Sequence, residues 1–171
     1  MKYIDSVLTN FRKYDVDGEN KVEDITMEDN LIIKGNNLLA LHSLKEKYAG
    51  KIKLIYLDIP YNSGSDSFNY NDKFNYSTWL TFMKNRIQVA KNLLSDEGFI
   101  FVQTSYHMYP HLKLLLDEIF SNNYICTFNV LVRHPERILK ADKDFHDVIE
   151  YIPTYSKNKF TNKIAKREEE N

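Results

Sequence analysis

The chain has 171 residues with 43% hydrophobic content, which is enough for one sizeable core and favours one domain over two. The formal net charge of -1 gives no basic surplus, so any nucleic-acid binding has to come from local patches or from a partner chain. The only cysteine, Cys126, excludes an intrachain disulfide and a cysteine-based zinc cluster, and no apolar run suits a signal peptide or a membrane span, so we expect a protein of the cytoplasm without a membrane partner.

Composition divides the chain into three segments. Residues 1–29 mix aromatic and charged residues around the turn-rich stretch Asp15–Asn20, which predicts a peripheral N-terminal arm. Residues 30–155 carry the apolar patterns of a folded domain. Residues 156–171 are rich in Lys, Asn and Glu, and we expect this charged tail to be disordered.

The first half of the domain predicts a strand, a helix and a second strand. Leu31–Ile33 is a short apolar run that ends at a glycine turn, and leucines then recur at helical spacing from Leu38 to Tyr48. The run Lys53–Asp58 is apolar without alternation, which is typical of a strand covered on both faces. Together these elements predict a parallel, right-handed β-α-β unit.

The second half continues the alternation of helices and strands. A helix is expected over 78–94 with Ser77 as its N-cap, a buried strand over 99–102, and a third helix opened by Pro110. Strands are expected over 124–132 and 148–155, and Pro153 favours an edge position or an irregular end for the second of them. The fold class is therefore α/β, with a mostly parallel sheet flanked by helices.

The stretch Asp58-Ile59-Pro60-Tyr61 follows the predicted strand at its carboxyl end, where ligands of α/β sheets bind. It offers a carboxylate acceptor, a backbone carbonyl at Ile59 held by the following proline, and a flat aromatic ring. These parts suit a planar amine: if the ligand is adenine, its N6 amino group donates to Asp58 and to the Ile59 carbonyl while Tyr61 stacks on the base. The polar and aromatic loop over 62–76 is long enough to border such a site.

The same residues carry a resemblance to a known family. Asp58-Ile-Pro-Tyr61 is similar to the Asp-Pro-Pro-Tyr motif of amino-methyltransferases. The chain from about 30 to 160 resembles the modification (Mod) subunit of type III restriction–modification systems. The matching stretches are Leu31-Ile-Ile-Lys-Gly-Asn-Asn-Leu-Leu-Ala-Leu41, Ile55-Tyr-Leu-Asp-Ile-Pro-Tyr-Asn62, Leu94-Ser-Asp-Glu-Gly-Phe-Ile-Phe-Val102, Lys113-Leu-Leu-Leu-Asp-Glu-Ile-Phe120, Asp144-Phe-His-Asp147, Glu150-Tyr151 and Tyr155-Ser-Lys-Asn158.

The resemblance implies a partial Rossmann-like domain of an adenine-N6 DNA methyltransferase that uses S-adenosyl-L-methionine and acts on a flipped adenine of double-stranded DNA. It gives the catalytic role to Asp58, Ile59, Pro60 and Tyr61. Asn36 and Asn37 would lie near the cofactor, although Asn36 as a plain helix N-cap needs no such role. As partners it implies a complementing C-terminal Mod fragment or a second Mod copy, and a restriction (Res) subunit. The implied function is that of an N-terminal fragment of this enzyme.

A basic loop is the candidate DNA contact, since Arg133, Arg137 and Lys140 are suited to phosphates. Neighbouring acidic residues dilute its charge, and a solvated loop explains it equally well. The histidines share no metal-like spacing with nearby acids, so no metal is expected.

The sequence departs from the family pattern at three places. Ile59 replaces the first proline of the motif, and Thr104–Tyr109 stands where an acidic stretch is expected after the strand. None of the five glycines forms a Gly-x-Gly pair, whereas family members with this motif order carry a Phe-x-Gly-x-Gly cofactor loop and a target-recognition region further along.

Two other functions remain open. An inactive truncated remnant would act at most as a DNA- or subunit-binding module. A nucleotide-dependent oxidoreductase or NTPase is disfavoured, because neither Gly-x-Gly-x-x-Gly nor Gly-x-x-x-x-Gly-Lys-[Ser/Thr] occurs.

Overall fold

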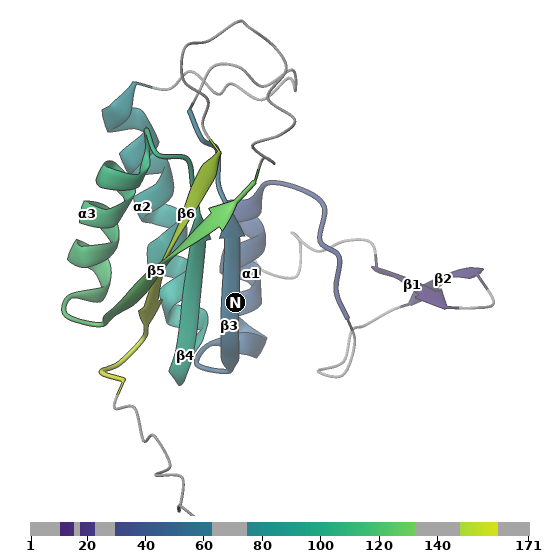
Figure 1. The fold of residues 1–171 in the computed structure, drawn as a ribbon. Coiled ribbons are helices and arrows are strands. Elements are labelled where there is room, and N and C mark those ends of the chain that lie inside the picture. Colours follow the sequence, from purple (N-terminus) through teal and green to yellow (C-terminus); the bar gives the residue numbers. More distant parts are fainter. Residues whose placement is uncertain (1–10, 16–17, 23–29, 63–74, 133–147, 161–171) are drawn as a thin grey trace, which may run out of the picture.

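The structure is a computed structural model that describes residues 11–15, 18–22, 30–62, 75–132 and 148–160. Within these ranges two strands come first, helices and strands then alternate from α1 to β5, and a last strand, β6, follows (Figure 1). Their bounds are β1 (Phe11–Asp15), β2 (Gly18–Val22), α1 (Asn37–Tyr48), β3 (Ile52–Asp58), α2 (Tyr76–Leu93), β4 (Leu94–Gln103), α3 (Tyr109–Phe120), β5 (Tyr124–Leu131) and β6 (Ile149–Ser156).

The central sheet has four strands in the order β3-β4-β6-β5. β3 and β4 are parallel and are joined by α2, whereas β6 runs antiparallel to both β4 and β5. The α/β fold class is confirmed, and three of the strands share one direction. The sheet is nevertheless mixed and not mostly parallel, because β6 lies between β4 and β5 and runs antiparallel to both. Of the three pairs of neighbouring strands, only β3–β4 is parallel.

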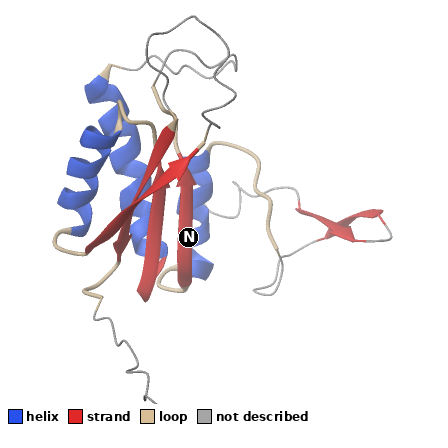
Figure 2. Cartoon of the chain, in the orientation of Figure 1, coloured by secondary structure: helices blue, strands red, loops and turns tan. Residues whose placement is uncertain are grey.

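The three helices lie on one side of the sheet, behind it in the view of Figure 2. Alternate residues of β4, Ile100 and Val102, point into this layer and are fully buried. The buried residues of α2 include Trp79, Met83, Ile87 and Ala90. Those of α3 are Leu112, Leu115, Leu116, Ile119 and Phe120. The resulting core comprises Ile59, Trp79, Met83, Ile87, Ala90, Leu94, Ile100, Val102, Met108, Leu112, Leu115, Leu116, Ile119, Phe120 and Tyr155. No helix in the described ranges is both long and apolar enough to cross a membrane.

The opposite face of the sheet is covered by none of the described helices. Leu54 and Tyr56 of β3 are 57% and 50% exposed, and Phe128 of β5 is 50% exposed. The prediction that β3 is covered on both faces is therefore wrong. Its unbroken apolar run produces one face that packs on the helices, through Ile55 and Leu57, and one open face.

The strand predicted over Leu31–Ile33 is also wrong, since this segment is irregular and Ile32 is 98% exposed. A short apolar run becomes a strand only when a neighbouring strand accepts its backbone hydrogen bonds, and the described chain pairs no strand with this run. The β-α-β unit that the structure does form is β3-α2-β4. Gly35 makes the turn before α1 with φ of 151°, a conformation that suits glycine.

Helix α2 begins two residues earlier than predicted. Its N-cap is Asn75, whose side chain accepts a hydrogen bond from the Thr78 backbone N–H at 2.8 Å, so the assignment of Ser77 as the cap is wrong. Asn75 was overlooked because both residues are good caps and spacing alone does not choose between them. The N-terminal proline of α3 is confirmed at Pro110.

Pro153 lies in an inner strand, which contradicts its predicted edge position. It pairs in register with Thr127 of β5. The pairing between β6 and β4 covers Thr154–Ser156 and resumes at the isolated bridge between Thr104 and Tyr151. Pro153 falls in the interval between these pairs, where the missing N–H of a proline costs no ladder hydrogen bond.

The tail predicted to be disordered from 156 onward is ordered over its described part. Ser156 is buried, the Lys157 backbone N–H donates to the Gly98 carbonyl at 2.9 Å, and the Phe160 ring meets Phe99 edge to face. The composition of this segment does not reveal these contacts, because they are made by backbone groups, one aromatic ring and the Lys157 side chain, which donates to the Leu94 carbonyl at 2.8 Å. The predicted arm contains the antiparallel pair β1–β2, and residues 161–171 lie outside the described residues.

Candidate active site

The strand ends place the predicted catalytic stretch at one edge of the sheet. Asp58 is the last residue of β3 and pairs in register with Gln103, the last residue of the parallel strand β4. Because β6 is antiparallel, it begins at the same edge, with Glu150 next to its first residue. Residues from three strands therefore converge where the chain leaves β3 (Figure 1).

Two contacts hold the backbone of the stretch from Asp58 to Tyr61. The Ile59 side chain is buried in the main core. The indole N–H of Trp79, a fully buried residue of α2, donates to the Pro60 carbonyl at 2.9 Å. The first motif proline is absent here, and its stiffening effect is replaced by packing at Ile59 and by the hydrogen bond from Trp79.

The Tyr61 ring is held from the other side. Its hydroxyl donates to Oε2 of Glu150 at 2.7 Å, and the Gln103 side-chain N–H donates to the same oxygen. The Tyr56 hydroxyl in turn donates to Oε1 of Gln103. Burial, the hydrogen bond to Glu150 and the charges of Glu150 and Asp58 raise the pKa of Tyr61 above its ordinary value, so the phenol stays protonated.

Asp58 lies on the open face of the sheet with an exposed carboxyl group. Burial and the charges of Asp58 and Glu150 raise the pKa of Tyr56 as well. Two carboxylates and two protonated phenols therefore share this edge, which can accept hydrogen bonds from an amine and offer an aromatic face.

The predicted cofactor residues Asn36 and Asn37 lie at the start of α1 and are occupied locally. Asn36 caps the helix by accepting from the Leu38 backbone N–H at 3.0 Å. Asn37 accepts from Nε of Arg86 in α2 at 2.7 Å. Because α1 runs down to the start of β3, its N-terminus and the end of β3 lie at the same end of the sheet (Figure 1), but these asparagine contacts are not made with Asp58–Tyr61.

Several predicted features fall outside the described residues. They are the basic loop with Arg133, Arg137 and Lys140, and most of the loop over 62–76. Across the described ranges, no group of three His, Cys, Asp or Glu side chains is arranged to hold a metal ion.

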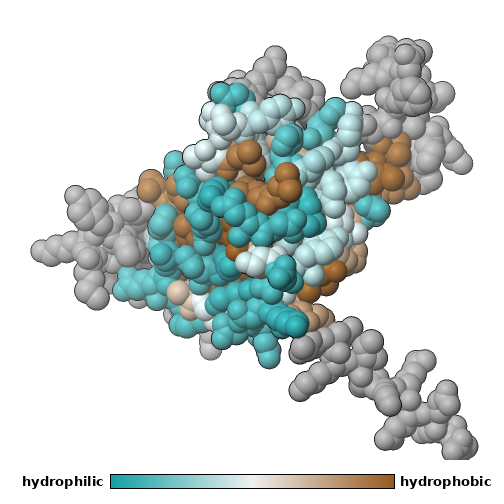
Figure 3. Space-filling view, turned by 90° about the vertical axis from the view of Figure 1, so that its left-hand side faces the viewer, coloured by the Kyte–Doolittle hydropathy of each residue, from teal (hydrophilic) through white to brown (hydrophobic). Residues whose placement is uncertain are grey.

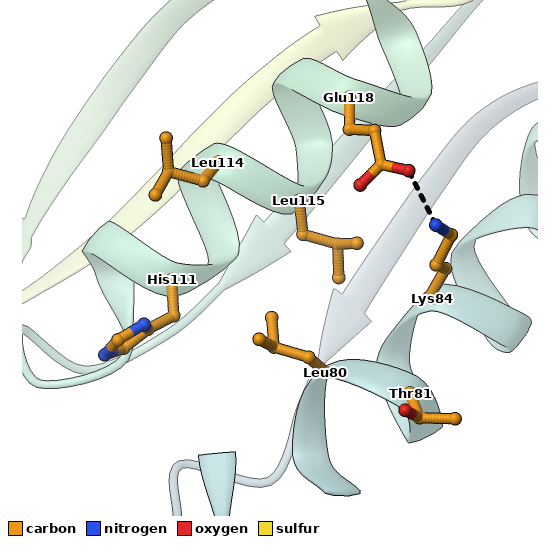
Figure 4. Close-up of a pocket in the computed structure, with 7 residues that line it drawn as sticks. All are labelled: Leu80, Thr81, Lys84, His111, Leu114, Leu115 and Glu118. Carbon is orange, nitrogen blue, oxygen red and sulfur yellow. Dashed lines mark hydrogen bonds and ion pairs between the residues drawn. The ribbon is translucent and has the colours of Figure 1, made fainter. Parts of the chain in front are cut away.

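A pocket of about 300 Å³ lies elsewhere, between α2 and α3 (Figure 4). Leu80 and Leu115 face each other across it, and Lys84 closes one end through an ion pair with Glu118 at 2.6 Å. Seen from the α3 side, the surface carries a hydrophobic patch within a hydrophilic surround (Figure 3). None of the predicted site residues lines this pocket.

Sequence reasoning missed four residues that support the site: Tyr56, Trp79, Gln103 and Glu150. Trp79 suits the apolar face of its helix, and helical spacing alone does not show its hydrogen bond to Pro60. Gln103 stands directly after a predicted strand, and Glu150 belongs to one of the matching stretches. Position alone does not show that Gln103 and Glu150 meet across the sheet.

Comparison with known proteins identifies the family to which this arrangement belongs. A family model described as DNA methylase matches residues 52–171, the part that contains the candidate site and the whole central sheet. The chain belongs to this DNA methylase family.

Relatives of the methylase segment include type III Mod subunits. The whole chain is 46% identical over 172 residues to the HindVI Mod subunit of Haemophilus influenzae, named as a probable type III restriction–modification enzyme. The alignment covers 94% of this chain and 23% of that protein. It is 33% identical over 174 residues to the EcoPI Mod subunit of Escherichia phage P1, which covers 82% of this chain and 26% of that protein. The chain thus spans about a quarter of the length of these relatives.

Solved structures show the same fold. A DNA modification methylase of Thermus thermophilus superposes with a TM-score of 0.51 at 14% identity, over 74% of this chain and 53% of that one. The cytosine-N4-specific PvuII DNA methyltransferase gives a TM-score of 0.51 at 16% identity, over 75% and 49% of the two chains. The prediction of a partial Rossmann-like methyltransferase fold and the recognition of a Mod-like segment are confirmed.

Proposed function

We propose that this chain supplies the amine-binding part of an S-adenosylmethionine-dependent DNA adenine-N6 methyltransferase of the type III Mod class. The observation that carries the proposal is the edge where β3 ends, at which Asp58, the Ile59–Pro60 backbone and Tyr61 are held together in a chain of the DNA methylase family. The similarity to Mod subunits supports adenine as the base.

The proposed chemistry follows from the acceptors at this edge. The Asp58 carboxylate accepts one N6 hydrogen of adenine. The Ile59 carbonyl accepts the second N6 hydrogen, because the Pro60 carbonyl already accepts a hydrogen bond from Trp79. Two acceptors on one side favour a more tetrahedral nitrogen, whose lone pair is then free to attack a methyl group. Charge-assisted hydrogen bonds contribute roughly 1.5–3 kcal/mol each.

Stacking on Tyr61 completes the binding of the base. A stacked base contributes roughly 1–3 kcal/mol, and together with the hydrogen bonds this offsets the few kcal/mol needed to flip adenine out of duplex DNA. The Tyr61 phenol is protonated at physiological pH, and its raised pKa extends the neutral form to more alkaline solutions. The open position of Asp58 leaves room for the base to approach.

S-adenosyl-L-methionine would supply the methyl group when bound. The side-chain oxygens of Asn36 and Asn37 accept hydrogen bonds from α1 and α2, and the chain has no Gly-x-Gly turn that lets backbone approach a cofactor. Other parts of the methylase would therefore hold most of the cofactor, and Asn36 and Asn37 would at most border it.

The remaining partners form part of the same proposal. Double-stranded DNA with a flipped adenine is the substrate, contacted through phosphates by Arg133, Arg137 and Lys140. A C-terminal Mod segment or a second Mod copy completes the site, a Res subunit binds the assembly, and the complex works in the cytoplasm. The methyltransferase domain begins at about residue 30, after an N-terminal arm.

A chimera tests the proposal. The chain replaces the matching segment of the phage P1 EcoPI Mod subunit, and transfer of tritiated methyl groups to adenine-containing duplex DNA is compared with that of the parent. We expect transfer by the chimera and none by the chain alone. In the chimera, Asp58→Ala should abolish transfer and retain cofactor binding measured by calorimetry. A folded, cofactor-binding chimera that transfers no methyl groups would instead favour an inactive binding module.

A further inference from the structure

Glu150 accepts two hydrogen bonds at the edge of the sheet where the catalytic stretch lies. Its Oε2 receives the Tyr61 hydroxyl at 2.7 Å and the Gln103 side-chain N–H. Through Gln103 it is connected to the Tyr56 hydroxyl. The four side chains come from β3, the loop after it, β4 and β6, so they join three strand ends to the loop that carries Tyr61.

Backbone contacts alone do not orient the Tyr61 ring. The buried Ile59 side chain and the Trp79–Pro60 hydrogen bond fix the chain up to Pro60. Beyond it, Asn62 has φ of 54°, so the backbone turns away into the left-handed region. Two side-chain torsions of Tyr61 then determine where its ring points, and the contact with Glu150 at the far end of the ring restrains both.

A carboxylate is suited to this restraint because it only accepts hydrogen bonds. The Tyr61 hydroxyl therefore has to donate toward β6, and the Gln103 amide has to present its N–H group to Glu150 and its oxygen to Tyr56. This leaves one consistent direction for every hydrogen bond in the set. A glutamine at 150 would allow alternative directions and would loosen the ring.

We propose that Glu150, held in place by Gln103, is a positioning residue that sets the orientation of the Tyr61 ring for stacking on the target base. The inference rests on the proposed function for the identity of the base, and on the structure for the contact itself. Glu150 acts by holding Tyr61 and does not bind the reacting amine. The residue that accepts a hydrogen bond from the amine is Asp58.

The contact is tested in the chain itself by fluorine NMR. The chain is labelled with 3-fluorotyrosine, and the resonance of residue 61 is assigned from its loss in Tyr61→Phe. The groups that face this hydroxyl are the carboxylates of Glu150 and Asp58 and the amide of Gln103. We expect the pKa of residue 61 to fall by about one unit or more in Glu150→Gln, because the charge and the acceptor that favour the protonated phenol are removed.

The matched control is Glu97→Gln, which removes an exposed carboxylate of β4 outside this network and should leave the pKa of residue 61 unchanged. An unchanged pKa in folded Glu150→Gln would overturn the proposal. If Glu150→Gln does not fold, Glu150→Asp serves instead. It keeps the charge but withdraws the acceptor by one methylene, and a smaller fall in the pKa supports the contact, whereas no fall refutes it.

The role of the contact is tested by kinetics in the EcoPI chimera. Glu150→Gln should raise KM for duplex DNA by at least about fivefold, since a misdirected ring stacks poorly, and should leave KM for S-adenosylmethionine within about twofold. In the Tyr61→Phe background the same substitution should have no further effect. An equal effect in both backgrounds would show that Glu150 does not act through Tyr61. A folded, cofactor-binding chimera that transfers no methyl groups refutes the proposed function, while the fluorine titration still decides whether Glu150 holds Tyr61.

Discussion

Replacing Trp79 by Phe tests whether the catalytic loop is anchored by α2. The substitution removes the 2.9 Å hydrogen bond to the Pro60 carbonyl and one of the two fused rings of a fully buried side chain. A net hydrogen bond contributes about 0.5–1.5 kcal/mol. Complete truncation of a buried Trp costs about 3–5 kcal/mol, and because Phe retains one ring we assign about 1–2 kcal/mol to the smaller volume. The expected loss of unfolding free energy is therefore about 1.5–3.5 kcal/mol.

Urea unfolding followed by far-UV circular dichroism measures this loss, since Trp79 is the only tryptophan and its fluorescence disappears with the substitution. Ile87→Val is the matched control, because Ile87 is a fully buried residue of the same helix that makes no side-chain hydrogen bond, and it should cost about 0.5–1.5 kcal/mol. Hydrogen exchange at the amides of 58, 59, 61 and 62 separates the two effects. Trp79→Phe should accelerate it beyond the change expected from global stability, and Ile87→Val should not. A loss below about 0.5 kcal/mol, or equal exchange in both variants, would refute the anchoring role.

Three further predictions concern the core and the carboxylate of Asp58, which we propose to be catalytic. Gly98→Ala should lower the unfolding free energy by about 1–3 kcal/mol in urea titrations, because the added Cβ would lie 2.8 Å from the Ile52 carbonyl oxygen. Wild-type stability of this variant would show that residue 98 has room for a methyl group. Burial and the hydrogen bond to Asp117 raise the pKa of Tyr155 above the ordinary phenol value of about 10. Stability should therefore be retained below about pH 10 and fall above it by up to about 1.4 kcal/mol per pH unit. Tyr155→Phe should flatten this alkaline slope, and an unchanged slope would contradict the assignment. Asp58→Ala, at an exposed position, should change thermal stability by less than about 0.5 kcal/mol while abolishing transfer in the chimera, and a large loss of stability would make Asp58 a structural residue.

The sequence by itself determined the local structure wherever one chemical signal dominated. The apolar stripe of α3 and its N-terminal proline fixed that helix, because side chains at 3.6-residue spacing can be buried only along one face. The acid, proline and aromatic ring after β3 likewise located the candidate site at Asp58–Tyr61. A carboxylate and a ring at the end of a strand are informative before any tertiary contact is known.

Tertiary structure decided which strands pair and which faces are covered. Leu31–Ile33 and Leu54–Leu57 are both apolar runs, yet only the second forms a strand, because β4 accepts its hydrogen bonds. Pro153 suits an inner strand because it falls in an interval of the ladder with β4, which depends on register and not on the proline itself.

The support of the site also came from tertiary structure alone. Glu150 lies 89 positions beyond Tyr61 and Gln103 lies 47 before Glu150, and the order β3-β4-β6 brings them together. Hydrogen bonds between residues so far apart leave no periodic trace in a sequence, since each residue type is ordinary at its own position. The chain therefore shows where its chemistry lies, and only the folded sheet shows what holds Tyr61 in place.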